Sequence, residues 1–184
     1  KNMDAVAALD AMDAHVDDWR DAVKGKQRGI FSFDDVAALK IKNLKKRIYT
    51  DIESIPAWKM KECIYKGVDD YEYLYDEWKE LNVGDRWGNN GWSAFFKNSF
   101  DMPERFKGKK VTLNVYFGGD SLLSLNGEPY QGLDPFRNSV LLTDCAKGDE
   151  HYDVDIESYY VWHSNESTVK TLSCSFVGVV DPEI

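Results

Sequence analysis

The chain has 184 residues, 43% of them hydrophobic and 14% aromatic, which is enough for the core of one domain with a short additional segment. The net charge of −9 is unevenly spread, because residues 1–66 hold 13 basic against 11 acidic side chains and residues 67–184 hold 10 against 21. The acidic second part argues against a nucleic-acid partner, since binding to phosphates requires a basic face.

Residues 1–66 have the periodicity of helices. Apolar side chains recur three or four positions apart over residues 5–23, and again over residues 37–48 with a continuation toward Ile52. Pro56 would end the second helix. The basic residues between Lys40 and Arg47 occupy its other faces, either as a patch for a partner or as a solvated face. The sequence therefore predicts two helices in a lead-in that ends near residue 66.

The pattern changes after the second predicted helix. Residues 58–65 alternate with a period of two, with Glu62 as the polar exception on the apolar face, which favours a strand or an extended connector. Residues 71–78 are acidic and aromatic and predict a short helical turn or a loop. Residues 84–91 are rich in Gly and Asn and predict a loop.

From residue 93 onward the sequence has the pattern of strands separated by turns. Asn126-Gly127 signals a two-residue hairpin turn, because both residues tolerate positive φ, and Gly118-Gly119-Asp120 predicts another tight hairpin. Seven short strands with frequent turns are typical of a β-sandwich or jelly roll, which we assign to residues 67–184. The predicted strands cover residues 93–101, 110–117, 121–125, 128–131, 139–142, 152–158 and 168–180.

A loop after the Asn126-Gly127 hairpin carries both acidic and basic groups. Loops held by a rigid scaffold are where binding groups concentrate. An aromatic ring could stack on a sugar while Asp, Asn or Arg side chains take its hydroxyl groups. Candidate residues for binding a carbohydrate or a neighbouring domain come from this loop and from the loop around residue 90: Trp87, Trp92, Asn126, Glu128, Tyr130, Asp134, Arg137 and Asn138.

Each of these candidates also has an interpretation without a ligand. Asn126, Asp134 and Asn138 are residue types that turns and strand starts favour. Arg137 can form an ion pair with Asp134 or with Glu128. The two tryptophans can pack into the core of the sandwich. Both interpretations stay open at the level of the sequence.

Signatures of catalysis and of metal binding are absent from the sequence. The three cysteines are Cys63, Cys145 and Cys174. Their wide spacing forms no metal-ligating pair or disulfide framework, which is typical of reduced cysteines in the cytoplasm. The three histidines contain no His-x-His pair, and no apolar run approaches the length of a membrane span. Glycoside hydrolysis needs two carboxylates at a defined spacing, but the acidic residues here are so numerous that such a pair is expected by chance. A pair of this kind would therefore be no evidence of catalysis, and we expect no independent catalysis.

Several motifs in order resemble family 38 glycoside hydrolases, the cytosolic-type α-mannosidases. Val83-Gly-Asp-Arg-Trp-Gly88 followed by Trp92-Ser-Ala-Phe-Phe96 is similar to one segment of that family. The pieces that follow in the family's order are residues 100–103, 106–111, 118–123, 126–132 and 152–158, with weaker support from residues 45–49 and 55–58. The resemblance therefore covers roughly residues 83–158.

This resemblance implies an N-terminal segment of an α-mannosidase, in which a helical lead-in precedes a jelly-roll domain similar to galactose-binding modules. The fold class expected is thus mainly β with two preceding helices. The catalytic domain would follow this chain and would bind zinc or a similar divalent ion. No catalytic residue, metal or cofactor is therefore expected within residues 1–184, and hydrolysis of terminal α-mannosides would belong to a cytoplasmic parent enzyme.

Three roles for such a segment are open at the level of the sequence. The domain can pack on its own catalytic domain or on a second copy in a homo-oligomer. It can bind α-mannoside glycans as a stand-alone carbohydrate-binding module. The loop that carries Arg137 can also reach into the neighbouring catalytic site and shape its substrate pocket.

Overall fold

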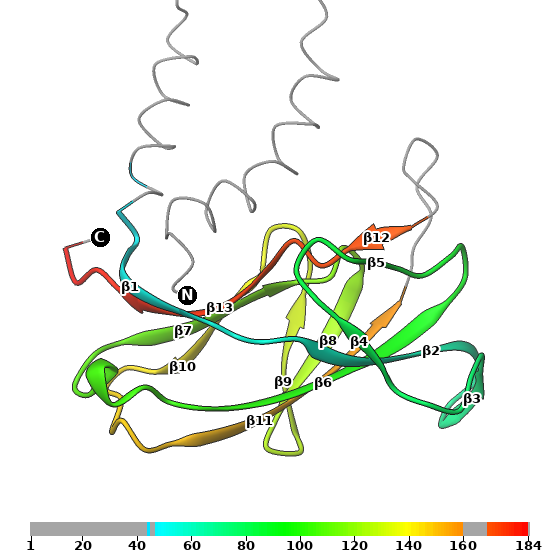
Figure 1. Cartoon of the computed structure of the whole chain (residues 1–184), viewed down its shortest axis with the longest axis horizontal. Helices are drawn as coiled ribbons and strands as arrows, with labels where there is room; N and C mark the ends of the chain where they lie inside the picture. Colours follow the sequence, from blue (N-terminus) through cyan, green and yellow to red (C-terminus); the bar gives the residue numbers. More distant parts are fainter. Residues whose placement is uncertain (1–43, 45–46, 160–168, 184) are drawn as a thin grey trace, which may run out of the picture.

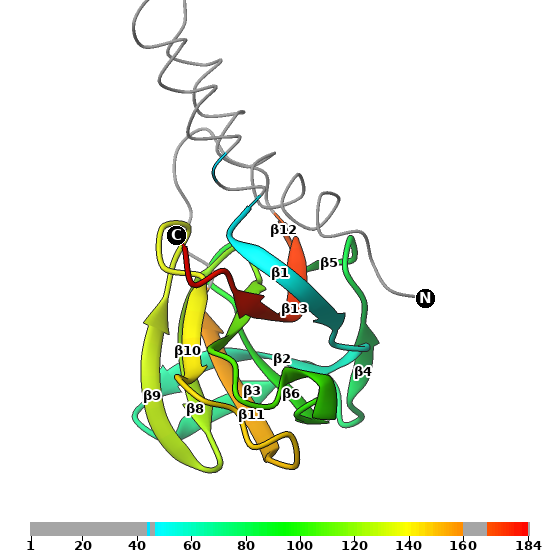
Figure 2. The same ribbon diagram turned by 90° about the vertical axis from the view of Figure 1, so that its left-hand side faces the viewer.

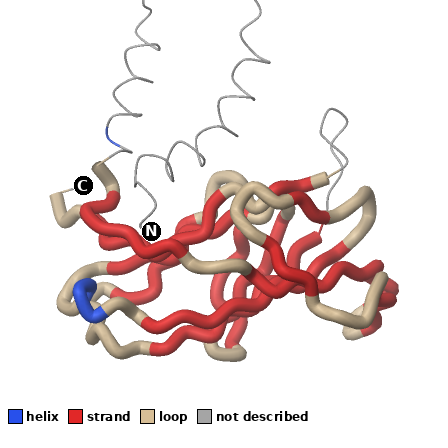
Figure 3. Tube along the Cα trace, viewed as in Figure 1, coloured by secondary structure: helices blue, strands red, loops and turns tan. Residues whose placement is uncertain are grey.

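The computed structural model describes residue 44 and residues 47–159 and 169–183. In this part of the chain, two antiparallel sheets pack face to face as a β-sandwich, as Figure 1 and the perpendicular view in Figure 2 show. Strands and the loops that join them make up nearly all of it (Figure 3). The β-sandwich predicted from the strand and turn pattern is therefore confirmed.

The two sheets differ in size. The smaller sheet has, in spatial order, β1 (Tyr49–Ser54), β13 (Cys174–Val180), β7 (Val111–Tyr116) and β10 (Ser139–Thr143). The larger sheet has β3 (Asp70–Tyr73), β2 (Trp58–Gly67), β6 (Ser93–Asp101), β11 (His151–Tyr159), β8 (Asp120–Leu125) and β9 (Glu128–Leu133), with β4 (Lys79–Leu81) paired to β2. A separate ribbon pairs β5 (Arg86–Trp87) with β12 (Lys170–Thr171), and the 3-10 turn η1 (Glu104–Phe106) precedes β7.

Aromatic rings from both sheets fill the centre of the core. The rings of Phe96 and Phe117 stack with centroids 3.9 Å apart, and Trp58 meets Phe117 edge to face at 5.1 Å. The Trp58 indole donates a 2.8 Å hydrogen bond to the Ser175 hydroxyl on the opposite sheet. Because a buried indole N–H needs an acceptor, this bond fixes how the sheets sit on each other.

The larger sheet buries only one of its two faces. Along β11, Val154, Ile156 and Ser158 are buried, whereas the residues between them are partly or fully exposed. The alternation follows from the period of two in a strand that has its core on one side. The outer face of this sheet is therefore available to solvent.

The smaller sheet buries side chains on both faces. A second cluster on the face away from the main core joins Ile52, Tyr116, Cys174 and Phe176, with Tyr49 packed against it. The Tyr49 ring lies so close to β13 that a Cβ built at Gly178 would be only 2.6 Å from its Cδ1 atom. Glycine at this position lets the aromatic ring lie directly on the strand.

Glu62, the polar exception on the apolar face of β2, is buried and is fully used by the fold. One carboxylate oxygen accepts from the Gly88 amide at 2.7 Å, and the other accepts from the Tyr75 hydroxyl at 3.1 Å. Burial raises the pKa of Tyr75 to about 12, and the nearby Glu62 carboxylate adds to this effect. A buried carboxylate is costly unless it is hydrogen-bonded, so Glu62 ties two loops to β2.

The N-terminal predictions are partly outside the described residues and partly wrong. The two helices expected over residues 5–23 and 37–48 lie outside them, apart from Leu44 and the last two positions. The continuation toward Ile52 is wrong, because residues 49–54 form β1 and pair with β13. Since β1 and β2 belong to the two sheets, the sandwich begins at Tyr49 rather than at residue 67.

The Gly118-Gly119 segment is a crossover between the sheets and not the predicted hairpin. Strand β7 before it belongs to the smaller sheet and β8 after it belongs to the larger one. A Cβ at Gly119 would lie 2.7 Å from both the Ser158 hydroxyl and the Tyr159 carbonyl oxygen. The glycines are thus needed for the close approach of two backbones, which the sequence pattern alone does not separate from a tight turn.

Candidate functional site

The Asn126-Gly127 turn joins β8 to β9 and has the geometry that the sequence predicts. Both residues have positive φ, 51° for Asn126 and 84° for Gly127, as a type I′ turn requires. The Asn126 amide N–H donates to the Asp153 carbonyl at 2.8 Å, and its side-chain oxygen accepts from the Asp153 amide at 2.9 Å. Asn126 therefore fixes the hairpin to β11, and its side-chain NH₂ group has no partner among the described residues.

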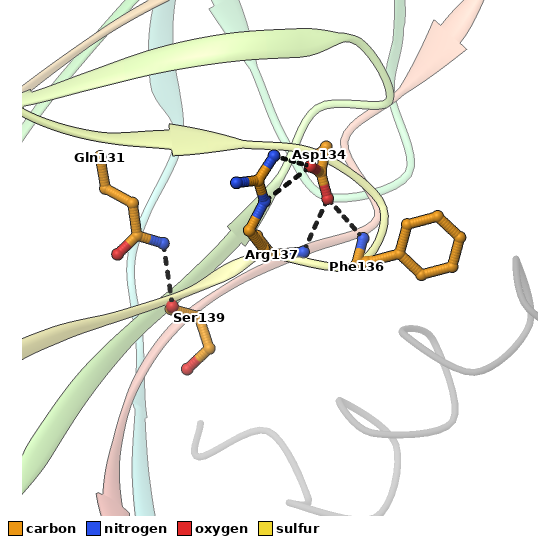
Figure 4. Close-up of polar contacts among 5 residues, drawn as sticks. All are labelled: Gln131, Asp134, Phe136, Arg137 and Ser139. Carbon is orange, nitrogen blue, oxygen red and sulfur yellow. Dashed lines mark hydrogen bonds and ion pairs between the residues drawn. The ribbon is translucent and has the colours of Figure 1, made fainter.

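The turn between β9 and β10 is closed by an ion pair between two of the predicted site residues (Figure 4). One Asp134 oxygen accepts from the amides of Phe136 and Arg137, at 2.8 and 2.9 Å. The other accepts from the Arg137 guanidinium at 2.8 and 2.6 Å. These hydrogen bonds, chiefly the one from Arg137, lower the pKa of the Asp134 carboxyl group. Of the two pairings open for Arg137, the structure has the one with Asp134.

Phe136 lies at the tip of this turn and points away from the sandwich (Figure 4). Phe136 is 91% exposed, which is unusual for a residue whose side chain has no polar atom. Nothing in the sequence pattern singled out Phe136, because a lone phenylalanine in a loop is equally compatible with core packing. A fixed turn with an exposed ring is a suitable anchor for another protein surface.

Trp87 is a core residue and is not available to a ligand. Its side chain is 2% exposed, its indole N–H donates to the Phe117 carbonyl at 2.6 Å, and its ring lies 5.1 Å from that of Phe96. The prediction of Trp87 as a binding residue is therefore wrong, and the core-packing interpretation is right. Trp92 is half-buried beside the turn that contains Asn89, and its part in binding stays a prediction.

The remaining predicted residues do not converge with Asn126 on one site. Tyr130 donates its hydroxyl proton to the Leu141 carbonyl on β10 at 2.7 Å, and the half-buried Asn138 accepts from the Val115 amide through its carbonyl. Glu128 is exposed and forms no ion pair within the described residues. Asn126 precedes β9 and the Asp134–Arg137 turn follows it, so they lie at opposite ends of this strand, about 20 Å apart at the usual rise of a strand.

The outer face of the larger sheet holds a polar groove that the sequence analysis missed. Its volume is about 600 Å³, and Asn126 is the one predicted site residue that lines it. The other polar side chains come from three neighbouring strands, β2, β6 and β11: Lys59, Lys97, Asn98, Ser99, Asp153 and Asp155. The signal in the sequence is the polar half of each strand's alternation, but only the register brings these positions together.

The first residue of β11 is a histidine that lies between two carboxylates, one of which lines this groove. The His151 ring nitrogens lie 2.7 Å from an Asp101 oxygen and 3.4 Å from an Asp153 oxygen. The hydrogen bond with Asp101, reinforced by Asp153, raises the pKa of His151. Because the ring is exposed, the solution pH decides whether it is protonated.

The same sheet face carries a cluster of aromatic side chains beside the groove. Tyr71 meets Tyr65 and Phe95 edge to face, with ring centroids 5.7 and 4.9 Å apart, and its hydroxyl donates to Glu157 at 2.7 Å. Cys63, which pairs with Tyr73 in register, is fully buried. These rings are therefore used mainly in packing against one another.

The described residues contain no ligand set for a metal ion. No group of three or more His, Cys, Asp or Glu side chains within them could hold one. The three cysteines are free thiols, with Cys63 and Cys174 buried and Cys145 exposed. Burial raises the pKa of Cys63 to about 11. No helix in the described part of the chain is long and apolar enough to cross a membrane.

Comparison with known proteins gives one family and several more distant likenesses. Residues 51–174 match the family described as "Alpha-mannosidase, jelly roll domain". The chain is 32% identical over 75 residues to human alpha-mannosidase 2C1, a stretch that covers 40% of this chain and 7% of that protein. The chain thus corresponds to a small part of this relative.

Two solved structures of glycosidases match this chain at 11% identity and at TM-scores below 0.5. A glycosyl hydrolase family 2 member from Bacteroides cellulosilyticus has a TM-score of 0.48, covering 71% of this chain and 21% of its own. A β-glucuronidase from an uncultured Clostridium sp. has a TM-score of 0.46, covering 72% and 29%. The match over residues 51–174 takes in most of the sandwich and confirms the jelly-roll prediction, so the chain belongs to the α-mannosidase jelly-roll domain family.

Proposed function

We propose that this chain is the non-catalytic, N-terminal part of an α-mannosidase, and that the parent enzyme hydrolyses terminal α-mannosides. The family match over residues 51–174 carries this proposal. The catalytic domain would follow residue 184 and would hold the zinc or similar divalent ion that the family resemblance implies. Residues 47–159 and 169–183 offer no fitting ligand set, so no step of the reaction is assigned to them.

The role of the sandwich in this proposal is to pack against the catalytic domain through the β9–β10 turn. Four hydrogen bonds from the backbone and from Arg137 to the Asp134 carboxylate hold the turn in one conformation. The backbone that carries Phe136 then has little conformational entropy left to lose on docking. Burying a phenylalanine ring contributes about 1.5–3 kcal/mol, which is appropriate for an anchor at a domain interface.

The first test is to read the open reading frame past residue 184. A His-x-His-x-Asp motif within roughly the next hundred residues supports the parent enzyme, because the resemblance to family 38 implies that this motif supplies zinc ligands in the catalytic domain. A stop codon or an unrelated domain there would overturn the proposal.

The packing role is tested with Phe136→Ala in the full-length polypeptide and in the 184-residue chain. The expected result is a lower Tm for the catalytic domain of the full-length variant and no change in the short chain. Val68→Ala is the matched control, because Val68 is 86% exposed on the β2–β3 turn. Equal effects of Phe136→Ala on both forms would contradict a contact between domains.

Two further expectations belong to this proposal. The free, partly buried cysteines support a reducing compartment such as the cytoplasm. The second expectation is that the parent enzyme assembles as a homo-oligomer, which light scattering on the full-length protein measures. A monomer there would remove the second copy as a partner for this domain.

A second candidate function is that of a stand-alone carbohydrate-binding module. The observation that favours it is the polar groove on the outer face of the larger sheet, which lies away from the β9–β10 turn.

A further inference from the structure

The groove on the outer face of the larger sheet is built on a row of side chains that the register brings together. Lys59 on β2 pairs with Lys97 on β6, and Lys97 pairs with Asp155 on β11. Their neighbours in sequence, Met60, Phe96 and Ile156, are buried in the core. The row therefore points to the outside, on central strands whose backbone hydrogen bonds are already used.

Two asparagines hold the two sides of the groove in place. The Asn98 side-chain NH₂ group donates to the carbonyls of Pro56 and Ala57 at 2.9 and 3.2 Å, and its oxygen accepts from the Ser99 amide. Asn126 ties the β8–β9 turn to Asp153 at the other side. These bonds fix the β1–β2 connection and the hairpin before any ligand arrives.

Several hydrogen-bonding groups in the groove are not used by the fold. Lys59 forms no ion pair within the described residues, and the Ser99 hydroxyl has no hydrogen-bond partner there. Lys97 pairs with one Asp155 oxygen at 3.0 Å and leaves the other free. The NH₂ group of Asn126 has no partner in the described part of the chain either. The groove therefore offers donors and acceptors side by side, the combination that hydroxyl groups need.

The charges of the lining cancel. Two lysines, Lys59 and Lys97, face two aspartates, Asp153 and Asp155. A phosphate or a polyanion would meet the two carboxylates, and a cationic ligand would meet the two ammonium groups. This balance favours a ligand with many hydrogen-bonding groups and no net charge.

An indole ring lies beside the charged row. Trp78 precedes β4 and is 40% exposed, and the Lys97 ammonium lies 5.6 Å from the centre of its ring. A partly exposed aromatic ring beside polar groups is suited to the mixed apolar and hydroxylated surface of a sugar ring.

A peptide that adds to the sheet as a further strand is a poor candidate for this position. Strand addition requires an open sheet edge. The groove lies over β2, β6 and β11, and each of these strands has neighbours on both sides. The occupant must therefore be recognised by side chains rather than by a free strand edge.

We propose that this groove is a binding site for a neutral carbohydrate, in which Lys59, Asp155 and Asn126 take the sugar hydroxyls and Trp78 borders one side. A volume of about 600 Å³ is in the range of small-molecule sites and accommodates one or two sugar rings. The groove and its ligand class follow from residues of this chain alone. Only the choice of mannosides as the first probe depends on the proposed function.

The site is tested by NMR titration of the ¹⁵N-labelled 184-residue chain with α-1,2-mannobiose and with cellobiose. We expect the amides of Asn126, Gly127 and Asp153 to shift on addition of at least one of these sugars. Glucuronate and glucosamine, which carry a negative and a positive charge, should bind more weakly than glucose.

Two variants assign the binding to the groove. Lys59→Ala should weaken the affinity about tenfold, the loss expected from one hydrogen bond to a charged group. Lys109→Ala is the matched control, because Lys109 is an exposed lysine on the segment before β7. Since both lysines are exposed, neither change should alter the Tm, which is measured alongside.

Three results would overturn the site. They are no amide shift with any neutral sugar, shifts confined to residues 134–138, and equal affinity of wild type and Lys59→Ala. Each leaves the proposed part in an α-mannosidase intact, because the reading frame past residue 184 tests that part independently. A reading frame that lacks a catalytic domain would conversely remove the parent enzyme and leave this site as it stands.

Discussion

At the scale of single residues, the predicted binding groups divide into those that the fold already uses and those that it leaves free. The guanidinium of Arg137 is occupied by Asp134, and the indole N–H of Trp87 by the Phe117 carbonyl. Sequence patterns identify residue types but not their partners. For these side chains the sequence therefore does not distinguish a role in ligand binding from a role in the fold. Burial and hydrogen bonding decide between them.

Trp87 provides a prediction about stability. Trp87→Phe removes the donor to the buried Phe117 carbonyl and should destabilise the chain by about 1–3 kcal/mol, measured by urea unfolding. Trp78→Phe, at a 40% exposed position, is the control and should stay within about 0.5 kcal/mol of wild type. A loss as small as that of the control would mean that the carbonyl finds another donor.

His151 provides a prediction about pH. Its pKa is raised in the folded state, chiefly by Asp101 and also by Asp153, so the stabilisation is fully present below the unfolded-state pKa of about 6.5. It is lost as the pH rises through the folded-state pKa. Asp101→Asn should lower the His151 pKa in an NMR titration, whereas Asp76→Asn, an exposed aspartate on another loop, should not. An unchanged pKa in Asp101→Asn would exclude the pairing.

At the scale of elements, strands with strong alternation and clear turns were predictable and short edge elements were not. The prediction of residues 93–101 coincides with β6, and the Asn126-Gly127 hairpin is confirmed. Strands β3, β4 and β5 are two to four residues long, too short for a period to be read. The sequence predicts a helix that continues into β1, because a few apolar residues fit either period.

Gly178 on β13 provides a prediction at this scale. In Gly178→Ala the added methyl group would overlap the Tyr49 ring. The Tyr49 hydroxyl donates to the Asn114 side-chain oxygen at 2.6 Å and holds the ring in place, so we expect a loss of about 1–3 kcal/mol. Gly132→Ala is the matched strand control, since its Cβ would meet only the Ser121 carbonyl at 3.9 Å. Thermal unfolding of both variants distinguishes the two sites. Equal Tm values would show that Tyr49 moves aside without cost.

At the scale of the whole molecule, the sandwich was predictable and the groove was not. Motif order and turn chemistry indicated the family and the architecture. The groove requires the register of β2, β6 and β11, which depends on how the sheets pack, and a shift by one residue would turn Lys97 into the core. Sequence reasoning therefore placed binding on the loops and missed the face of the sheet.

Arg137 provides the prediction for the complete enzyme. Arg137→Ala in the full-length enzyme removes the side chain that closes the β9–β10 turn and should raise KM for an α-mannoside. Because the residue is exposed, we expect little change in the Tm of the 184-residue chain. Lys109→Ala serves as the control for removing an exposed cation. A lowered Tm with unchanged KM and kcat would show that the turn supports folding and does not shape the substrate pocket.

The contact between β9 and β10 has a consequence for the behaviour of the protein at high concentration. Each of these strands ends one of the sheets, and the Tyr130 hydroxyl and the Gln131 amide on β9 donate to the Leu141 and Ser139 carbonyls on β10. Strand β9 also contains Pro129, which has no N–H to offer to a newcomer. Side chains of β9 thereby occupy two carbonyls on the open edge of β10, which makes this edge of the folded domain a poorer template for edge-to-edge aggregation into fibres.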